Sequence, residues 1–389
     1  MMKIKDIKTN VVSVPYRKPE RWSWGHRRGG TFIILQVLTD SGIVGLGEIT
    51  SFIDASYVHP MIETIKKILV GEDPTNVELL MYKLGAYGLH NVANLVVSGV
   101  EMALLDIAAK EIDKPLYRLL GGCFRREVPF APWLLLDMPE KMVKEAEKFV
   151  NEGFKTFYIK VGVDEKLDYT RVKAIRESLG DEVKIRIDAN GGWAVGEAVR
   201  NLKRLGEFDI EFAEEPTTRE GLARVREASN IPVASGDSAT TLNDIYGLLK
   251  DKSVDLISHI DPGFQGGILA SKKACSLCEA AEIPVVAHTK LELGIGLAAI
   301  LHLVASTPNF FYPHQALYMY LESDVILGDG FVFEGGALKV PEGPGLGVDL
   351  DRKKVEKYEA MYKQVGTLTA YGDVDLSRLG RPLLQKYWL

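Results

Sequence analysis

A regular alternation of strand-like and helix-like segments, between residues 125 and 312, constrains the fold more than any other feature of this chain. Helix-like segments such as AVGEAVRNLKRL and TLNDIYGLLKD separate short apolar runs that have the length of strands. Adjacent runs start 22–29 residues apart, near Glu127, Lys155, Lys184, Asp209, Ile231, Val254, Ile283 and Asn309. Because each right-handed crossover between parallel strands needs a helix, eight strands at this pitch predict a parallel β/α barrel.

The segments on either side of this alternation have a different character. Residues 1–50 contain three strand-like runs with a turn at Ser41–Gly42, and residues 58–122 have helical periodicity that ends at a Gly-Gly pair. After the barrel segment come two short strand-like runs and a polar helix. We therefore expect an N-terminal α+β domain over residues 1–122, a barrel over 123–340, and a tail over 341–389 that packs back on the first domain.

Charge and composition exclude several classes of protein. The formal net charge is −6, which argues against nucleic acid or an anionic membrane as the main partner. No uncharged apolar run approaches the length of a membrane span, and the N-terminus MMKIKDIKTN lacks the pattern of a signal peptide. Three cysteines are too few for a disulfide framework. We expect a cytoplasmic enzyme.

Three acids follow successive strand-like runs of the predicted barrel. Asp188, Glu214 and Asp237 are separated by 26 and 23 residues. Residues just beyond the carboxyl ends of barrel strands meet at one mouth, where three carboxylates would repel one another without a cation between them. Oxygen ligands of this kind suit Mg²⁺. Any one of these acids alone would also fit a loop residue or a helix cap, so the prediction of a metal site depends on all three together.

A lysine and a tyrosine share one face of the second predicted strand. In the run FYIKVG, Tyr158 lies two residues before Lys160, so both side chains point into the barrel. Near a divalent cation the pKa of Lys160 would fall, which would make its amine a usable base near neutral pH. A salt bridge from Lys160 to one of the carboxylates is the alternative, and it is compatible with catalysis.

The sixth and seventh predicted strands end in an acid and a histidine. Asp261 and His288 would be neighbours across adjacent strand ends, where the acid would fix the tautomer of the imidazole and raise its basicity. His288 would then face the site opposite Lys160. A structural role for the histidine is the alternative. We expect His259, just before Asp261, to point toward the helices or the barrel wall.

A basic, tryptophan-bearing loop is predicted between the first two strands. It reads RKPERWSWGHRRGGT and contains Trp22, Trp24 and Arg27. Such a loop could lie over a site and bind an anionic substrate, whereas a solvated basic loop is the alternative.

The chain also carries a set of short motifs that are specific in combination. They are LLGG at Leu119–Gly122, DAN at Asp188–Asn190, EEP at Glu214–Pro216, GD at Gly236–Asp237, D-x-x-x-x-G-G at Asp261–Gly267 and PGLG at Pro344–Gly347. With these motifs the whole chain resembles the enolase superfamily, in its mandelate racemase/muconate lactonizing enzyme (muconate cycloisomerase) family. The pairing of Asp261 with His288 is most similar to the mandelate racemase subgroup.

This resemblance implies a fold and a mechanism. The fold is a (β/α)₇β TIM-like barrel with an α+β capping domain formed by the N-terminal region and the C-terminal tail. The mechanism is removal of the proton α to a carboxylate, with Mg²⁺ on Asp188, Glu214 and Asp237 stabilising an enediolate. Lys160 matches the lysine that acts as base. Homo-oligomers are common in the family, and loops matching Trp22–Arg28 and Phe52–His59 close over the substrate.

Two positions depart from the family pattern. The second strand usually reads Lys-x-Lys, and here Tyr158 replaces the first lysine, so we expect Tyr158 to contact the substrate instead. Racemase-like members place a Glu on the eighth strand, whereas that region here reads NFFYPHQ, so His314 or Gln315 would have to substitute for it.

Four functions remain open from the sequence. The leading one is a lyase or isomerase that dehydrates, racemises or epimerises a small hydroxy-carboxylate such as an acid sugar. A muconate- or sugar-lactone-type cycloisomerase is the alternative. A Schiff-base aldolase, with Lys160 attacking a carbonyl, would leave the three carboxylates unexplained. A binding protein without activity is the remaining option, suggested by Tyr158 and the missing eighth-strand acid.

Overall fold

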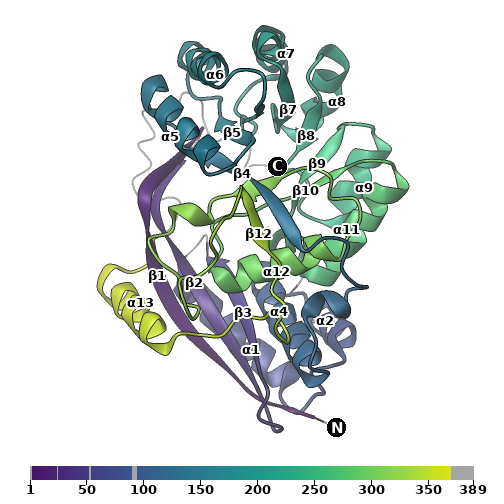
Figure 1. The fold of residues 1–389 in the computed structure, drawn as a ribbon. Coiled ribbons are helices and arrows are strands. Elements are labelled where there is room, and N and C mark those ends of the chain that lie inside the picture. The colour runs from purple at the N-terminus through teal and green to yellow at the C-terminus, as the bar shows by residue number, and fades with distance from the viewer. Residues whose placement is uncertain (1, 24, 52–53, 90–93, 369–389) are drawn as a thin grey trace.

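A parallel barrel forms the larger part of the molecule (Figure 1). The structure is a computed structural model that describes residues 2–23, 25–51, 54–89 and 94–368. Its strands follow the order β10-β9-β8-β7-β6-β5-β4-β11. The bounds are Glu127–Leu134 (β4), Thr156–Lys160 (β5), Lys184–Asp188 (β6), Ile210–Glu214 (β7), Val233–Ser235 (β8), Leu256–Ile260 (β9), Val285–Ala287 (β10) and His314–Ala316 (β11). A bridge between Val285 and Phe310 brings the two ends of the sheet together, so the barrel is nearly closed. The predicted fold is confirmed.

Helices follow the strands and cover the outside of the barrel (Figure 1). They are Pro139–Asn151 (α5), Glu165–Leu179 (α6), Val195–Leu205 (α7), Arg219–Ala228 (α8), Leu242–Lys250 (α9), Pro262–Gln265 (α10), Ile268–Ala280 (α11) and Gly294–Ala305 (α12). Strands β5 and β9 are buried along their whole length, as expected for parallel strands that are covered on both faces.

The eighth strand begins later than the sequence suggested. The apolar run NFFYP was expected to form it from Asn309, but the strand pairs with β4 from His314 to Ala316. Only Phe310 of the apolar run makes a bridge. Prolines at 308 and 313 bracket the run and cannot donate to a sheet ladder, so the paired strand starts after the second of them.

In its described residues, the N-terminal part consists of an antiparallel sheet and helices. The sheet contains Ile4–Trp22 (β1), Gly25–Thr39 (β2) and Val44–Ser51 (β3), and the helices are Val58–Leu69 (α1), Val77–Ala86 (α2) and Asn94–Glu111 (α4). The predicted loop around Trp22 was wrong, because most of it continues β1 and β2 as a long hairpin with an irregularity between Pro15 and Glu20. Glu20 pairs with Arg27 across the two strands, an opposite-charge contact that extends the ladder.

The C-terminal part returns to both other parts of the molecule. Ala337–Lys339 (β12) pairs antiparallel with β4, and Arg352–Val365 (α13) packs against β1 (Figure 1). No helix within the described ranges is both long and apolar enough to span a membrane.

Two buried carboxylates join the N-terminal part to the barrel. Glu48 on β3 accepts from the backbone N–H groups of Leu293 and Gly296, both at 2.8 Å, at the start of α12. Glu101 on α4 accepts in the same way from Ile268 and Leu269 at the start of α11. Each acid accepts hydrogen bonds from N–H groups that a helix N-terminus leaves unpaired. The N-terminal part, which we call the capping region, therefore supplies N-caps to two barrel helices.

Candidate active site

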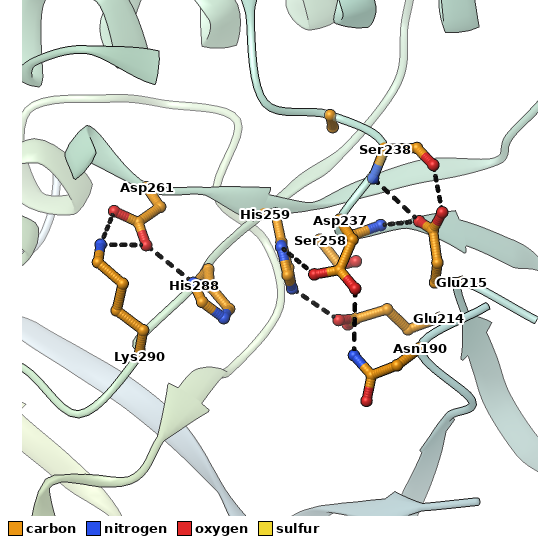
Figure 2. A network of polar contacts seen from close by, with 12 residues as sticks. Asn190, Glu214, Glu215, Asp237, Ser238, Ser258, His259, Asp261, His288 and Lys290 are labelled. Carbon is orange, nitrogen blue, oxygen red and sulfur yellow. Dashed lines mark hydrogen bonds and ion pairs between the residues drawn. The ribbon is translucent and has the colours of Figure 1, made fainter. Parts of the chain in front are cut away.

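The three predicted metal ligands lie together at the carboxyl end of the barrel. Asp188 ends β6 and pairs in register with Glu214, which ends β7, and Asp237 follows β8. Figure 2 shows Glu214 and Asp237. Asp188 and Glu214 are almost completely buried. Burial, and then the neighbouring charges of Glu214 and Asp237, raise the pKa of Asp188 to about 6, although Lys160 opposes this. The site therefore holds an excess of buried negative charge that a cation would stabilise.

Tight turns present these acids at the strand ends. Asn190 and Glu215 have φ angles of 45° and 39°, a left-handed conformation that is uncommon outside glycine and often marks functional sites. The backbone N–H of Asn190 donates to Asp188 at 2.7 Å. Glu215 accepts from the backbone N–H of Gly236 at 2.8 Å, which fixes the loop that carries Asp237.

Lys160 lies beside the first of these acids. Its Nζ is 2.7 Å from Asp188 Oδ2 and 3.0 Å from Asn190 Oδ1, and it lies 3.9 Å from the centre of the Trp133 ring. The predicted salt bridge is therefore present. It places the amine at the mouth of the barrel, next to the carboxylates, as a proton-transfer group requires.

Asp261 and His288 form the predicted pair, together with a lysine that sequence analysis missed. His288 Nδ1 is 2.8 Å from Asp261 Oδ2. The ammonium of Lys290 lies 2.5 and 2.6 Å from the two oxygens of the same carboxylate (Figure 2). Burial opposes ionisation of Asp261, but Lys290 and His288 hold its pKa well below its usual range.

His259 is a further site residue, and the expectation that it points away from the mouth was wrong. Its Nε2 is 2.9 Å from Glu214 Oε1, and its ring lies 3.8 Å from the ring of His288 (Figure 2). Burial alone would lower the pKa of His259, but the charge of Glu214 raises it. The strand alternation could have revealed this position, because His259 lies two residues before Asp261 and must share its face.

The two positions that differ from the family pattern lie at different depths in the barrel. Tyr158 is fully buried below Lys160, between Trp133 and Phe212, and its hydroxyl is 3.3 Å from an Nη of Arg186. On the eighth strand, Gln315 reaches the site and donates from Nε2 to Glu214 Oε2 at 3.1 Å.

The other eighth-strand residue considered for this position does not reach the carboxylates. His314 Nδ1 accepts from the backbone N–H of Ala287 at 3.2 Å, and its ring packs edge-on against Phe130 and Phe310.

The tip of the β1–β2 hairpin lies across the mouth. Ser23 donates to the carbonyl of Ala189 at 3.2 Å, next to the first metal ligand. Arg27, paired with Glu20 at 2.5 Å, lies over the Trp22 ring and donates to the Lys290 carbonyl at 3.4 Å. Two of the three hairpin residues predicted to bind substrate are thus placed beside the site, whereas Trp24 lies outside the described residues, as do Phe52 and residue 53 of the second predicted covering loop.

The donor set of Asp188, Glu214 and Asp237 fits a hard divalent cation, since all three side chains are carboxylates that lie close together. In the described part of the chain, no three His, Cys, Asp or Glu side chains are arranged to hold an ion as they stand. Lys160 and His259 each occupy an oxygen of this set. Binding of a metal would therefore require these side chains to rotate.

Comparison with known families gives two matches that together span nearly all of the described chain. Residues 6–121 match the N-terminal domain of the mandelate racemase/muconate lactonizing enzyme family, and residues 141–354 match the family described as enolase C-terminal domain-like. The chain belongs to the mandelate racemase/muconate lactonizing enzyme family of the enolase superfamily. The resemblance found in the sequence motifs is confirmed.

Similar members of this family are isomerases. An L-Ala-D/L-Glu epimerase from Bacillus subtilis is 30% identical over 89% of this chain and 97% of that protein. A chloromuconate cycloisomerase from Cupriavidus necator is 29% identical over 92% of this chain and 99% of that protein. A dipeptide epimerase from Cytophaga hutchinsonii, solved with Mg and the dipeptide D-Ala-L-Val, has a TM-score of 0.86 and 27% identity over 91% of this chain and 98% of that one.

These relatives bear on the expected reaction. They support an isomerase of this family, consistent with removal of an α-proton. The acid-sugar substrate and the dehydratase activity expected from the sequence have no support among them.

Proposed function

We propose that this protein is a Mg²⁺-dependent isomerase that removes and returns the proton on the carbon α to a carboxylate, as a racemase or epimerase. One observation carries the proposal: the two acid–base groups stand on either side of the carboxylates. Lys160 ends β5 and His288 follows β10, and the strands that carry or precede Asp188, Glu214 and Asp237 lie between them in the barrel. A substrate held over the carboxylates would present one face to each group.

Asp188, Glu214 and Asp237 would hold the metal, with Gln315 and Asn190 as neighbouring polar groups. When bound, Mg²⁺ would stabilise the negative charge that develops on the substrate carboxylate as the proton leaves.

His288 is prepared for proton transfer by its partner. Because ionised Asp261 accepts from Nδ1, the neutral imidazole presents Nε2 as the atom that accepts a proton. Lys160 serves the opposite face of the substrate, from a position held by Asp188 and Asn190. A proton removed on one face and returned on the other inverts the α-carbon, which is the chemistry of a racemase or epimerase.

We propose a small carboxylate as the substrate, such as a dipeptide or an N-acylated amino acid. The names of the epimerase relatives support this class over acid sugars. Trp22 and Arg27 on the hairpin tip would contact the part of the substrate remote from the α-carbon. Tyr158 packs against Trp133, whose ring lies beside the ammonium of Lys160, and would act through that ring. Dehydration of a hydroxy-carboxylate uses the same groups and is the weaker alternative.

A cycloisomerase is the second candidate, because a chloromuconate cycloisomerase is as similar as the epimerases. The Asp261–His288 pair favours the epimerase, since it supplies a second proton-transfer group opposite Lys160.

The test is proton exchange followed by NMR in D₂O with Mg²⁺. The panel contains both stereoisomers of dipeptides, N-acylated amino acids, acid sugars and muconate. We expect solvent deuterium to enter the α-carbon of one class, and Lys160→Ala or His288→Ala to reduce turnover by about 10²–10⁴-fold. Exchange that persists for one stereoisomer in each variant would assign each base to a face. Full turnover by the doubly substituted protein would refute the assignment.

A further inference from the structure

Lys290 lies at the active site, but the proposed reaction assigns it no role. Its side chain is buried, with Nζ 2.5 and 2.6 Å from the oxygens of Asp261 and 3.6 Å from Glu292. It borders a cavity of about 20 Å³ between the capping region and the barrel, which has room for a water molecule but not for a substrate. The ammonium therefore acts on Asp261 rather than on a ligand in that cavity.

The backbone around Lys290 is held firmly from several sides. The N–H of Lys290 donates to both oxygens of Glu292 at 2.9 and 3.0 Å, and its carbonyl accepts from Arg27. The next residue, Leu291, has a φ of 77°, a strained conformation for a branched side chain that persists only where surrounding contacts impose it. The position of the ammonium is thus determined by both the barrel and the capping region.

The charges around His288 explain why a lysine matters here. A buried carboxylate paired with a histidine alone would draw a second proton onto the imidazole. Here Lys290 already balances the charge of Asp261, and His259 lies against the other face of the His288 ring. Burial, followed by His259 and Lys290, lowers the pKa of His288 to about 4, although Asp261 opposes them.

We propose that Lys290 is a positioning residue: it keeps Asp261 ionised and fixed, so that His288 carries one proton on Nδ1 and presents a free Nε2 to the substrate. This inference rests on the proposed function in one respect, namely that His288 acts as a base. Four charged or titratable groups act on the imidazole of His288. His259 lies on β9, Asp261 follows that strand, Lys290 lies two residues after His288, and Glu214 ends β7.

The test measures the protonation of His288 directly and needs no substrate. The full-length protein is labelled with ¹⁵N-histidine, and His288 is assigned by the loss of its signals in His288→Asn. In the wild type we expect a neutral ring protonated on Nδ1, and a titration midpoint well below the ordinary histidine value of about 6.5. In Lys290→Met we expect the midpoint to rise by about one pH unit or more, so that both nitrogens are protonated at a pH where the wild-type ring is still neutral.

The control is Lys272→Met, which removes a half-buried ammonium that donates to the Ser306 carbonyl behind the barrel. It should leave the His288 signals unchanged, and Lys290→Arg, which retains a cation, should keep the neutral Nδ1-protonated ring. A His288 midpoint in Lys290→Met equal to that of the wild type would overturn the proposal. If Lys290→Met does not fold, a wild-type His288 that titrates at or above the ordinary histidine value of about 6.5 overturns the proposal instead. If no substrate exchanges its α-proton but the ¹⁵N-histidine spectra behave as expected, the proposed function is refuted and the role of Lys290 is not.

Discussion

Replacing Glu48 by Gln should make the protein less sensitive to alkaline pH. The carboxylate of Glu48 is buried and accepts two backbone hydrogen bonds at the start of α12. Burial raises its pKa from 4.5 to about 8, against the effect of the two N–H groups. Between these values the folded protein retains a proton that the unfolded chain releases, so the stability contributed by Glu48 is present at low pH and is lost as pH rises through about 8.

The size of this effect follows from linkage. One proton of difference changes the free energy of unfolding by about 1.4 kcal/mol per pH unit. From pH 5.5 to 7.5, the Glu48→Gln variant should therefore gain about 2–3 kcal/mol of stability relative to the wild type. At pH 5.5 the carboxylic acid and the amide are both neutral, but the NH₂ of Gln cannot accept from one of the two backbone N–H groups, so the variant should start from a lower stability and the prediction concerns how the difference changes with pH.

The assay is urea unfolding, followed by circular dichroism at several pH values, of both proteins and of Glu182→Gln, which alters an exposed acid. The exposed variant should keep a constant difference from the wild type. A difference between Glu48→Gln and the wild type that stays constant across this pH range, or that grows in favour of the wild type, would refute the reasoning.

Two further substitutions test the packing of the cap and the electrostatics of the site. A Cβ on Gly47 would lie 2.0 Å from the backbone carbonyl of Gly99 on α4, so Gly47→Ala should lower stability in thermal unfolding by about 1–3 kcal/mol, whereas Gly196→Ala, in an open helical position, should not. His259→Ala leaves Glu214 without its imidazole partner and should cost the metal-free protein about 1–3 kcal/mol. Added MgCl₂ should raise the melting temperature of that variant more than that of the wild type, and an equal rise would contradict competition between the imidazole and the cation.

The barrel could be predicted because its strands carry a strong local signal. Strands such as β5 and β9 are short, apolar runs buried on both faces, and helices separate them at a regular pitch. The same rule misplaced the eighth strand, because hydrophobicity marked NFFYP while the prolines around it decided where pairing begins. The hairpin around Trp22 was predicted as a loop because its residues are polar and show no apolar strand pattern. They nevertheless pair as strands, and the contact of Glu20 with Arg27 stabilises the pairing.

The site could be predicted where function depends on position along a strand. Asp188, Glu214 and Lys160 end their strands, so their convergence follows from the barrel alone. Lys290 could not be found this way. It follows β10 in an irregular segment, and its contact with Asp261 depends on the turn at Leu291 and on Arg27 from the other end of the chain.

The N-caps that Glu48 and Glu101 supply can form only late in the synthesis of the protein. The backbone partner of Glu48 at Leu293 is 245 residues further along the chain, and that of Glu101 at Ile268 is 167 residues further. At about 5–20 residues per second, the ribosome adds the partner of Glu48 roughly 10–50 s after Glu48 itself. During that interval the two carboxylates lack the helix N-termini that they cap in the folded protein. Chaperones that bind nascent chains would have their greatest effect on this protein in that period.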